Sequence, residues 1–250
     1  MIEHITSKQN PLCKHVKKLR DNRAYRYAQQ EFLADGTKLV AEALKWGRVN
    51  TLILREDVRM DELPDALRTV IVPKSIMQEL SRMDTPQGAI AVCAMPEQPA
   101  FSPRPGTVLL DGIQDPGNLG TMLRTADAFD VPLVLLSGCA DPYGEKTVRA
   151  SMGAVLRTPP VQADWAQVRQ ACEALQIPVC ATALTETAKD IRDIDLRAFL
   201  TVIGSEGQGV RPEILEFASQ TAIIPMSERC ESLNAAVAAS LVMWELQNKR

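Results

Sequence analysis

The sequence has few of the residues that metal centres and disulfide frameworks require. It has 250 residues but only two histidines, His4 and His15, and its six cysteines include no C-x-x-C pair. Zinc sites usually combine closely spaced thiols and imidazoles, so we expect no bound metal. We also expect the cysteines to be the reduced thiols of a cytoplasmic protein.

Long apolar runs and phosphate-binding loops are also missing. No stretch of 18 apolar residues and no charged-then-apolar leader occurs, so we expect no membrane partner. The glycine-rich segment 204–210 reads GSEGQGV, which is neither the dinucleotide pattern G-x-G-x-x-G nor a phosphate loop ending in G-K-[ST]. These absences disfavour an enzyme that binds NAD or ATP.

The charge of the chain is unevenly distributed. The net charge is −3 and 46% of the residues are hydrophobic, as in ordinary globular proteins. Residues 8–26, however, contain seven lysines and arginines and only one acid, Asp21. Such a run forms either a solvated helix face or a patch that contacts phosphates.

Prolines divide the chain into two parts. Residues 96–106 read PEQPAFSPRPG, and prolines at this density neither continue a helix nor pair inside a sheet. A semi-rigid linker at 96–106 therefore separates a domain over 1–95 from one over 107–250. The first reads as a small α/β domain, with one helix over 11–29 and Thr37 capping the next helix. The second alternates short apolar strands with helices, which predicts a parallel sheet covered on both faces.

Ligands of such sheets bind at the carboxyl ends of the strands, and three loops follow predicted strands there. In the first loop, residues 111–131, Asn118 can cap a helix that carries Arg124. In the second, residues 204–210, glycines allow close backbone approach, and Glu206 could bind hydroxyls or a cationic group of a ligand. Each loop also has a plain structural interpretation: an exposed arginine, or a glycine turn with a solvated acid.

The third loop lies within residues 224–246, where a strand end leads into a small-residue helix. Ser232 or Asn234 could cap that helix, whose first N–H groups are available to a ligand. A capped core helix would explain the same pattern.

Taken in order, the three loops resemble the motifs of the SpoU (TrmH-like) branch of the SPOUT methyltransferases, which methylate ribose 2′-hydroxyls in tRNA and rRNA. The matching segments are Asn118-Leu119-Gly120 with Arg124-Thr125-Ala126, then Gly204-Ser205-Glu206-Gly207-Gln208-Gly209, then Ile224-Pro225-Met226 with Ser232-Leu233-Asn234 and Ala238. Residues 146–154 resemble a further helix of that family. Residues 32–44 resemble the substrate-binding domain often fused in front of it, although Asp35-Gly36 stands where Glu-Gly is usual.

This resemblance implies an α/β protein whose C-terminal parallel sheet contains a trefoil knot, preceded by a small L30e-like domain. It implies a homodimer that uses S-adenosylmethionine. The implied cofactor contacts are Thr182, Ala183, Leu184, Gly204, Glu206, Gly209, Ile224, Met226, Leu233 and Asn234. The positions implied in catalysis or substrate placement are Asn118, Arg124, Glu206, Ser232 and Asn234. In this light, the expected RNA contacts in the basic segment are Lys8, Lys14, Lys17, Lys18 and Arg20.

The RNA target and the role of Arg124 are less directly indicated. The front domain is similar to those of rRNA-modifying relatives and favours 23S rRNA, with a tRNA methyltransferase or a non-catalytic RNA-binding protein as alternatives. Because a guanidinium has a pKa above about 12, Arg124 is a poor base. We expect it to hold the phosphate next to the target ribose and to stabilise the developing alkoxide.

Overall fold

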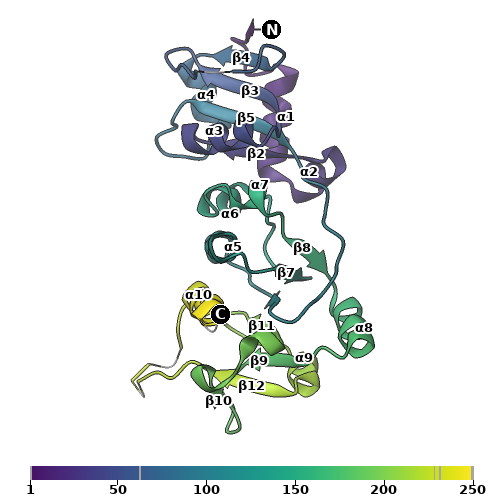
Figure 1. The fold of residues 1–250 in the computed structure, drawn as a ribbon. Helices are drawn as coiled ribbons and strands as arrows, with labels where there is room; N and C mark the ends of the chain where they lie inside the picture. The colour runs from purple at the N-terminus through teal and green to yellow at the C-terminus, as the bar shows by residue number, and fades with distance from the viewer. Residues whose placement is uncertain (1, 62, 228, 231, 249–250) are drawn as a thin grey trace. The chain divides into compact units, whose positions relative to one another are not determined.

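The computed structural model of the protein describes residues 2–61, 63–227, 229–230 and 232–248. The chain forms two compact units (Figure 1): unit 1 is Met1–Glu97 with Asp141–Arg157, and unit 2 is Gln98–Ala140 with Thr158–Arg250. This division differs from the sequence-based boundary in one segment, because residues 141–157 belong to unit 1.

Unit 1 is built on a mixed sheet in the strand order β1-β4-β3-β5-β2. Strand β5 is antiparallel to β2 and β3, whereas β4 is parallel to β1 and β3. The elements are β1 (Ile2–His4), α1 (Pro11–Asp21), α2 (Arg23–Gln29), β2 (Glu31–Asp35), α3 (Thr37–Lys45), β3 (Val49–Arg55), β4 (Arg68–Val72), α4 (Lys74–Leu80), β5 (Ala89–Ala94), α6 (Glu145–Ala150) and α7 (Ala154–Arg157).

The segment 141–157 joins unit 1 through both apolar and ionic contacts. The ring of Tyr143 packs against that of Phe32, with 5.2 Å between centroids, inside a buried cluster that also includes Val148. Asp141 accepts hydrogen bonds from Arg26 Nε at 2.9 Å and Nη2 at 2.6 Å, and both side chains are more than nine-tenths buried. These contacts explain why a segment inside the predicted second domain folds with the first.

Unit 2 contains a seven-stranded sheet in the order β10-β12-β9-β11-β6-β7-β8, and all its pairings are parallel. The predicted parallel α/β sheet is therefore confirmed. The elements are β6 (Val108–Asp111), α5 (Pro116–Phe129), β7 (Leu133–Leu136), β8 (Val161–Ala163), α8 (Trp165–Leu175), β9 (Val179–Thr182), β10 (Lys189–Asp190), 3-10 turns at Ile191–Asp193 and Leu196–Ala198, β11 (Leu200–Gly204), α9 (Pro212–Phe217), β12 (Gln220–Ile223) and α10 (Ala235–Asn248).

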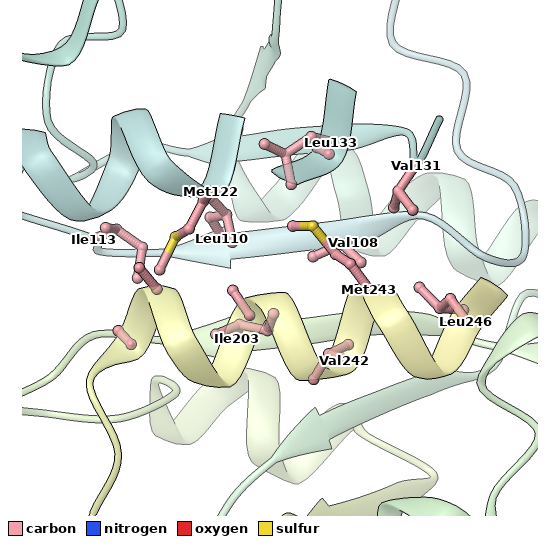
Figure 2. Close-up of a cluster of buried hydrophobic side chains, with 14 of the residues drawn as sticks. Val108, Leu110, Ile113, Met122, Val131, Leu133, Ile203, Val242, Met243 and Leu246 are labelled. Carbon is pink, nitrogen blue, oxygen red and sulfur yellow. The ribbon is translucent and has the colours of Figure 1, made fainter. Parts of the chain in front are cut away.

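Helices α5 and α10 pack together over one face of this sheet. Figure 2 shows Met122 of α5 and Met243 of α10 among side chains from β6 and β11, including Leu110 and Ile203, and all four are buried. Such burial contributes about 1.5–3 kcal/mol for each large apolar side chain. The packing fixes the start of α10 beside the carboxyl ends of the strands.

Two local predictions for unit 1 were wrong. The expected single helix over 11–29 is broken at Asn22, whose backbone is extended and whose side chain caps α2 by accepting from Tyr25 N at 2.9 Å. Thr37 is the first residue of α3 and not its cap, which is Gly36 with φ of +113°. Within the described residues, no helix is both long enough and apolar enough to cross a membrane.

Candidate functional site

A cavity of unit 2 lies where β9, β11 and β12 end, as the rule for parallel sheets predicts. Its volume is about 440 Å³, within the range of small-molecule sites. The described residues that line it are Thr182, Ala183, Leu184, Thr185, Ile203, Gly204, Ser205, Glu206, Gln208, Gly209, Val210, Leu215, Ala222, Ile223, Ile224, Met226, Ser232, Leu233, Ala235 and Ala238.

One wall of the cavity is a tight hairpin after β11. Ser205 N donates to Gly209 O at 3.1 Å, and Gly209 N donates to Ser205 O at 3.0 Å. A Cβ atom on Gly204 would lie only 2.0 Å from the carbonyl carbon of Gly209, so a side chain cannot be accommodated there. The glycine at 204 thus allows two backbone segments to meet at the cavity wall.

Asn118 has a different role from the predicted helix cap. Asp115 caps α5 by accepting from Asn118 N at 2.8 Å, which places Asn118 in the first turn of the helix. The Asn118 side chain donates through Nδ2 to Glu206 Oε1 and accepts at Oδ1 from Asn234 Nδ2 at 3.1 Å. Three residues, one in α5, one in the hairpin after β11 and one directly before α10, therefore form one hydrogen-bonded array.

Asn234 both caps α10 and ends this array. Its Oδ1 accepts from Ala236 N at 2.9 Å and from Val237 N at 3.3 Å, so the prediction of Asn234 as a cap is confirmed. Capping fixes the side chain so that Nδ2 faces Asn118. Ser232 precedes it and lines the cavity.

Most of the predicted site residues come together. Nine of the ten predicted cofactor contacts line the cavity, and the tenth, Asn234, reaches it through Asn118 and Glu206. Arg124 is the exception: it is exposed on α5 and is not among the described residues that line the cavity.

Sequence reasoning missed part of the cavity wall. Ile203, Ala222 and Ile223 are ordinary apolar residues, and only their position at the strand ends could have identified them. Ala235 and Ala238 lie on the alanine-rich helix α10, and small side chains there leave the space open.

The predicted basic segment in unit 1 divides into two sets. Lys8 and Lys17 both pair with Glu79, which lowers the pKa of that carboxyl to about 2. Arg20 pairs with Asp21 and donates to the carbonyl oxygens of Glu79 and Leu80 at 2.8 and 3.2 Å. These three cations are engaged within unit 1.

Lys14 and Lys18, one turn apart on α1, form the second set. Both are exposed, and neither has an acidic partner among the residues that the structure describes. Lys18 Nζ lies 5.4 Å from the centroid of the Tyr25 ring, a cation–π distance. Their charges face solvent.

Cys180, the second residue of β9, is a fully buried free thiol. Burial raises the pKa of the Cys180 thiol on β9 to about 11, so it stays protonated at neutral pH. In the described part of the chain, no group of three or more histidine, cysteine or acidic side chains could hold a metal ion.

Comparison with known proteins identifies the family. Residues 105–244 match the SpoU rRNA Methylase family, and residues 10–91 match the MRM3-like substrate binding domain. The chain belongs to the SpoU rRNA Methylase family. It is an S-adenosylmethionine-dependent RNA 2′-O-methyltransferase.

Individual relatives are similar over their whole length. The 23S rRNA (guanosine(2553)-2'-O)-methyltransferase RlmP of Bacillus subtilis is 33% identical, with 98% of this chain and all of the relative covered. The AdoMet-bound rRNA methyltransferase of Sinorhizobium meliloti has a TM-score of 0.86 at 30% identity, covering 99% and 98% of the two chains. The AviRb methyltransferase of Streptomyces viridochromogenes in complex with AdoMet has a TM-score of 0.83 at 28% identity, covering 97% and 98%.

Proposed function

We propose that the cavity at the ends of β9, β11 and β12 holds S-adenosylmethionine. The observation that carries this proposal is that nine predicted cofactor contacts from three separate loops line one cavity. Backbone and apolar groups suit an adenine, whose edge needs paired donors and acceptors and not charge. The Glu206 carboxylate at the rim suits ligand hydroxyls or a cationic group.

S-adenosylmethionine supplies an electrophilic methyl group when bound. The protein must then align a ribose oxygen and accommodate the loss of its proton. We assign the alignment to the array of Asn118, Glu206 and Asn234, whose amide and carboxylate groups can bind ribose hydroxyls at the rim. Ser232, which also lines the cavity, belongs to the same rim.

We assign Arg124 to the RNA phosphate next to the target ribose, where its charge would also stabilise the alkoxide. The pH–rate profile of an Arg124→Lys variant tests this assignment. We expect the variant to have lower activity with an unshifted profile, because lysine keeps the charge but not the planar fork. Full activity with a profile moved toward the lysine range would make this residue the base.

We also propose that the enzyme is a homodimer that associates through α10. Val237, Leu241 and Trp244 are spaced along one side of this helix and are 48%, 40% and 51% exposed. Arg124 lies on α5, which packs against α10, so a second copy on this face would come close to it. We expect Leu241→Glu with Trp244→Glu to give monomers in sedimentation equilibrium. A dimer that persists in this variant would contradict the assignment.

We propose 23S rRNA in the cytoplasm as the substrate. The support is the RlmP relative, together with the substrate-binding domain that precedes the catalytic one. In this proposal residues 1–95 bind RNA, with Lys8, Lys14, Lys17, Lys18 and Arg20 as candidate contacts. Residues 96–106 link them to a catalytic part over 107–250, of which residues 141–157 fold with unit 1. The trefoil knot that the family resemblance implies would lie in the catalytic domain.

Two measurements test the function. Calorimetry with S-adenosylmethionine should show binding to the native chain, and no binding would contradict the cavity assignment. Mapping of 2′-O-methyl groups in cells with and without this gene should reveal one position lost from 23S rRNA. Loss of a tRNA modification in its place would support the alternative target.

A further inference from the structure

Asp111, the last residue of β6, has a buried carboxylate at the carboxyl ends of the strands, where the cavity also lies. It is 2% exposed and stands opposite Gly204 in the parallel pairing of β6 with β11. A carboxylate at such depth is costly unless charged or hydrogen-bonding partners compensate it. Its partner is Arg211, which directly follows the hairpin 205–210.

The Asp111 carboxylate binds both the main chain and the side chain of Arg211. Oδ2 accepts from Arg211 N at 2.9 Å, and Oδ1 accepts from Arg211 Nε at 2.7 Å. Two charge-assisted bonds from one carboxylate determine both where Arg211 lies and how it is turned. The remaining contact of the guanidinium is weaker, since Nη1 lies 3.3 Å from Glu213.

The other end of the hairpin is fixed by the strand itself. Gly204 ends β11, and the two backbone bonds between Ser205 and Gly209 close the loop. The hairpin is thus fixed at one end by β11 and at the other by Asp111. In this position Glu206 contacts Asn118, and Gly209 lines the cavity.

We propose that Asp111 is a positioning residue for methyl transfer. By binding Arg211 it fixes the position of the hairpin. The hairpin in turn fixes the positions of Glu206 and of the backbone that faces the cofactor. Asp111 does not itself line the cavity in the described part of the chain, so it acts through Arg211. The inference rests on the proposed cofactor site.

The test compares Asp111→Asn, Arg211→Lys and a control, Asp141→Asn, which weakens an Arg–Asp pair in unit 1 whose carboxylate is also buried. An asparagine can accept only one of the two bonds, so we expect Asp111→Asn to weaken S-adenosylmethionine binding on the order of tenfold in calorimetry. Arg211→Lys keeps the charge and the backbone bond, so its loss should be smaller. Asp141→Asn should leave the affinity unchanged.

Two further readouts separate positioning from general stability. In Asp111→Asn, the amides of Ser205 and Gly209 should exchange hydrogen faster while those of β7 and β9 keep their protection. The KM for S-adenosylmethionine should rise and kcat should fall, because Glu206 moves with the hairpin.

Native affinity and native exchange in Asp111→Asn would overturn the inference. Uniformly faster exchange across unit 2 would also overturn it, since the pair would then only stabilise the fold. If the unmodified chain binds no S-adenosylmethionine, the cofactor site fails separately, and the exchange at Ser205 and Gly209 still tests whether Asp111 fixes the hairpin.

Discussion

The two units of the chain bury charge in different places. Unit 1 buries charge: Arg26 pairs with Asp141 in its interior, and the carboxyl groups of Asp35 and Glu145 are also buried. Unit 2 buries one carboxylate, Asp111, against Arg211 beside the hairpin after β11. Its cavity is lined by backbone, glycine, apolar side chains and a few uncharged polar ones, with the Glu206 carboxylate at the exposed rim. Added volume at the hairpin should therefore damage the cavity of unit 2 most, whereas loss of the Asp141 charge should damage the stability of unit 1 most.

The largest expected effect is that of Gly204→Ala. The new methyl group would meet Gly209 and Val210 backbone atoms at 2.0–2.3 Å, so the hairpin must move. We expect S-adenosylmethionine binding to fall beyond detection in calorimetry, since overpacking of this kind costs about 1–3 kcal/mol or more and here distorts the site. Gly207→Ala is the matched control, because no atom lies within 4 Å of the added group. Equal losses in both variants would mean that the hairpin is sensitive to any substitution.

The second prediction concerns the ion pair in unit 1. Asp141→Ala leaves the buried Arg26 charge without its partner and should lower the free energy of unfolding of unit 1 by about 3–5 kcal/mol. Denaturant unfolding measures this loss, and calorimetry should show unchanged cofactor affinity in unit 2. Glu3→Ala removes an exposed pair with Arg68 and should cost at most about 1 kcal/mol. A loss of cofactor affinity in Asp141→Ala as large as that in Gly204→Ala would contradict the contrast between the units.

Sequence reasoning was most successful where chemistry and periodicity coincide. Glu206 was predicted because loops after apolar strands must meet at the carboxyl ends of a parallel sheet, whereas Leu233 was predicted from the family resemblance, and both line the cavity. The role of Asn118 was wrong in detail, because Asp115 was an equally good cap and local sequence could not choose between them. The placement of residues 141–157 could not be predicted, since it depends on contacts of Tyr143 and Asp141 with residues more than 100 positions away.

The third prediction compares the two sets of cations in the basic segment. Lys14→Gln with Lys18→Gln removes charges that face solvent, whereas Lys8→Gln with Lys17→Gln removes the same charge from groups paired with Glu79. We expect the first variant to bind RNA about tenfold more weakly and to lower the salt dependence by about 0.7 per lost phosphate contact. The second variant should change both quantities less. Filter binding at several salt concentrations checks this, and equal effects would mean that only net charge matters.

The smallest expected effect is a change in how the stability of unit 1 depends on pH. Burial raises the pKa of Glu145, and the nearby charge of Asp35 adds to this; burial also raises the pKa of Asp35, although Ser81 Oγ donates to it at 2.5 Å. As pH rises past the ordinary glutamate pKa, the unfolded chain ionises first, so the folded state loses stability until its own raised pKa is passed. Glu145→Gln removes this titration, so unfolding midpoints measured from pH 4 upward should decline less in the variant than in the native chain. The same slope in both proteins would show that the folded Glu145 titrates like an exposed glutamate. The contribution of buried charge to unit 1 would then depend on the pair of Arg26 and Asp141.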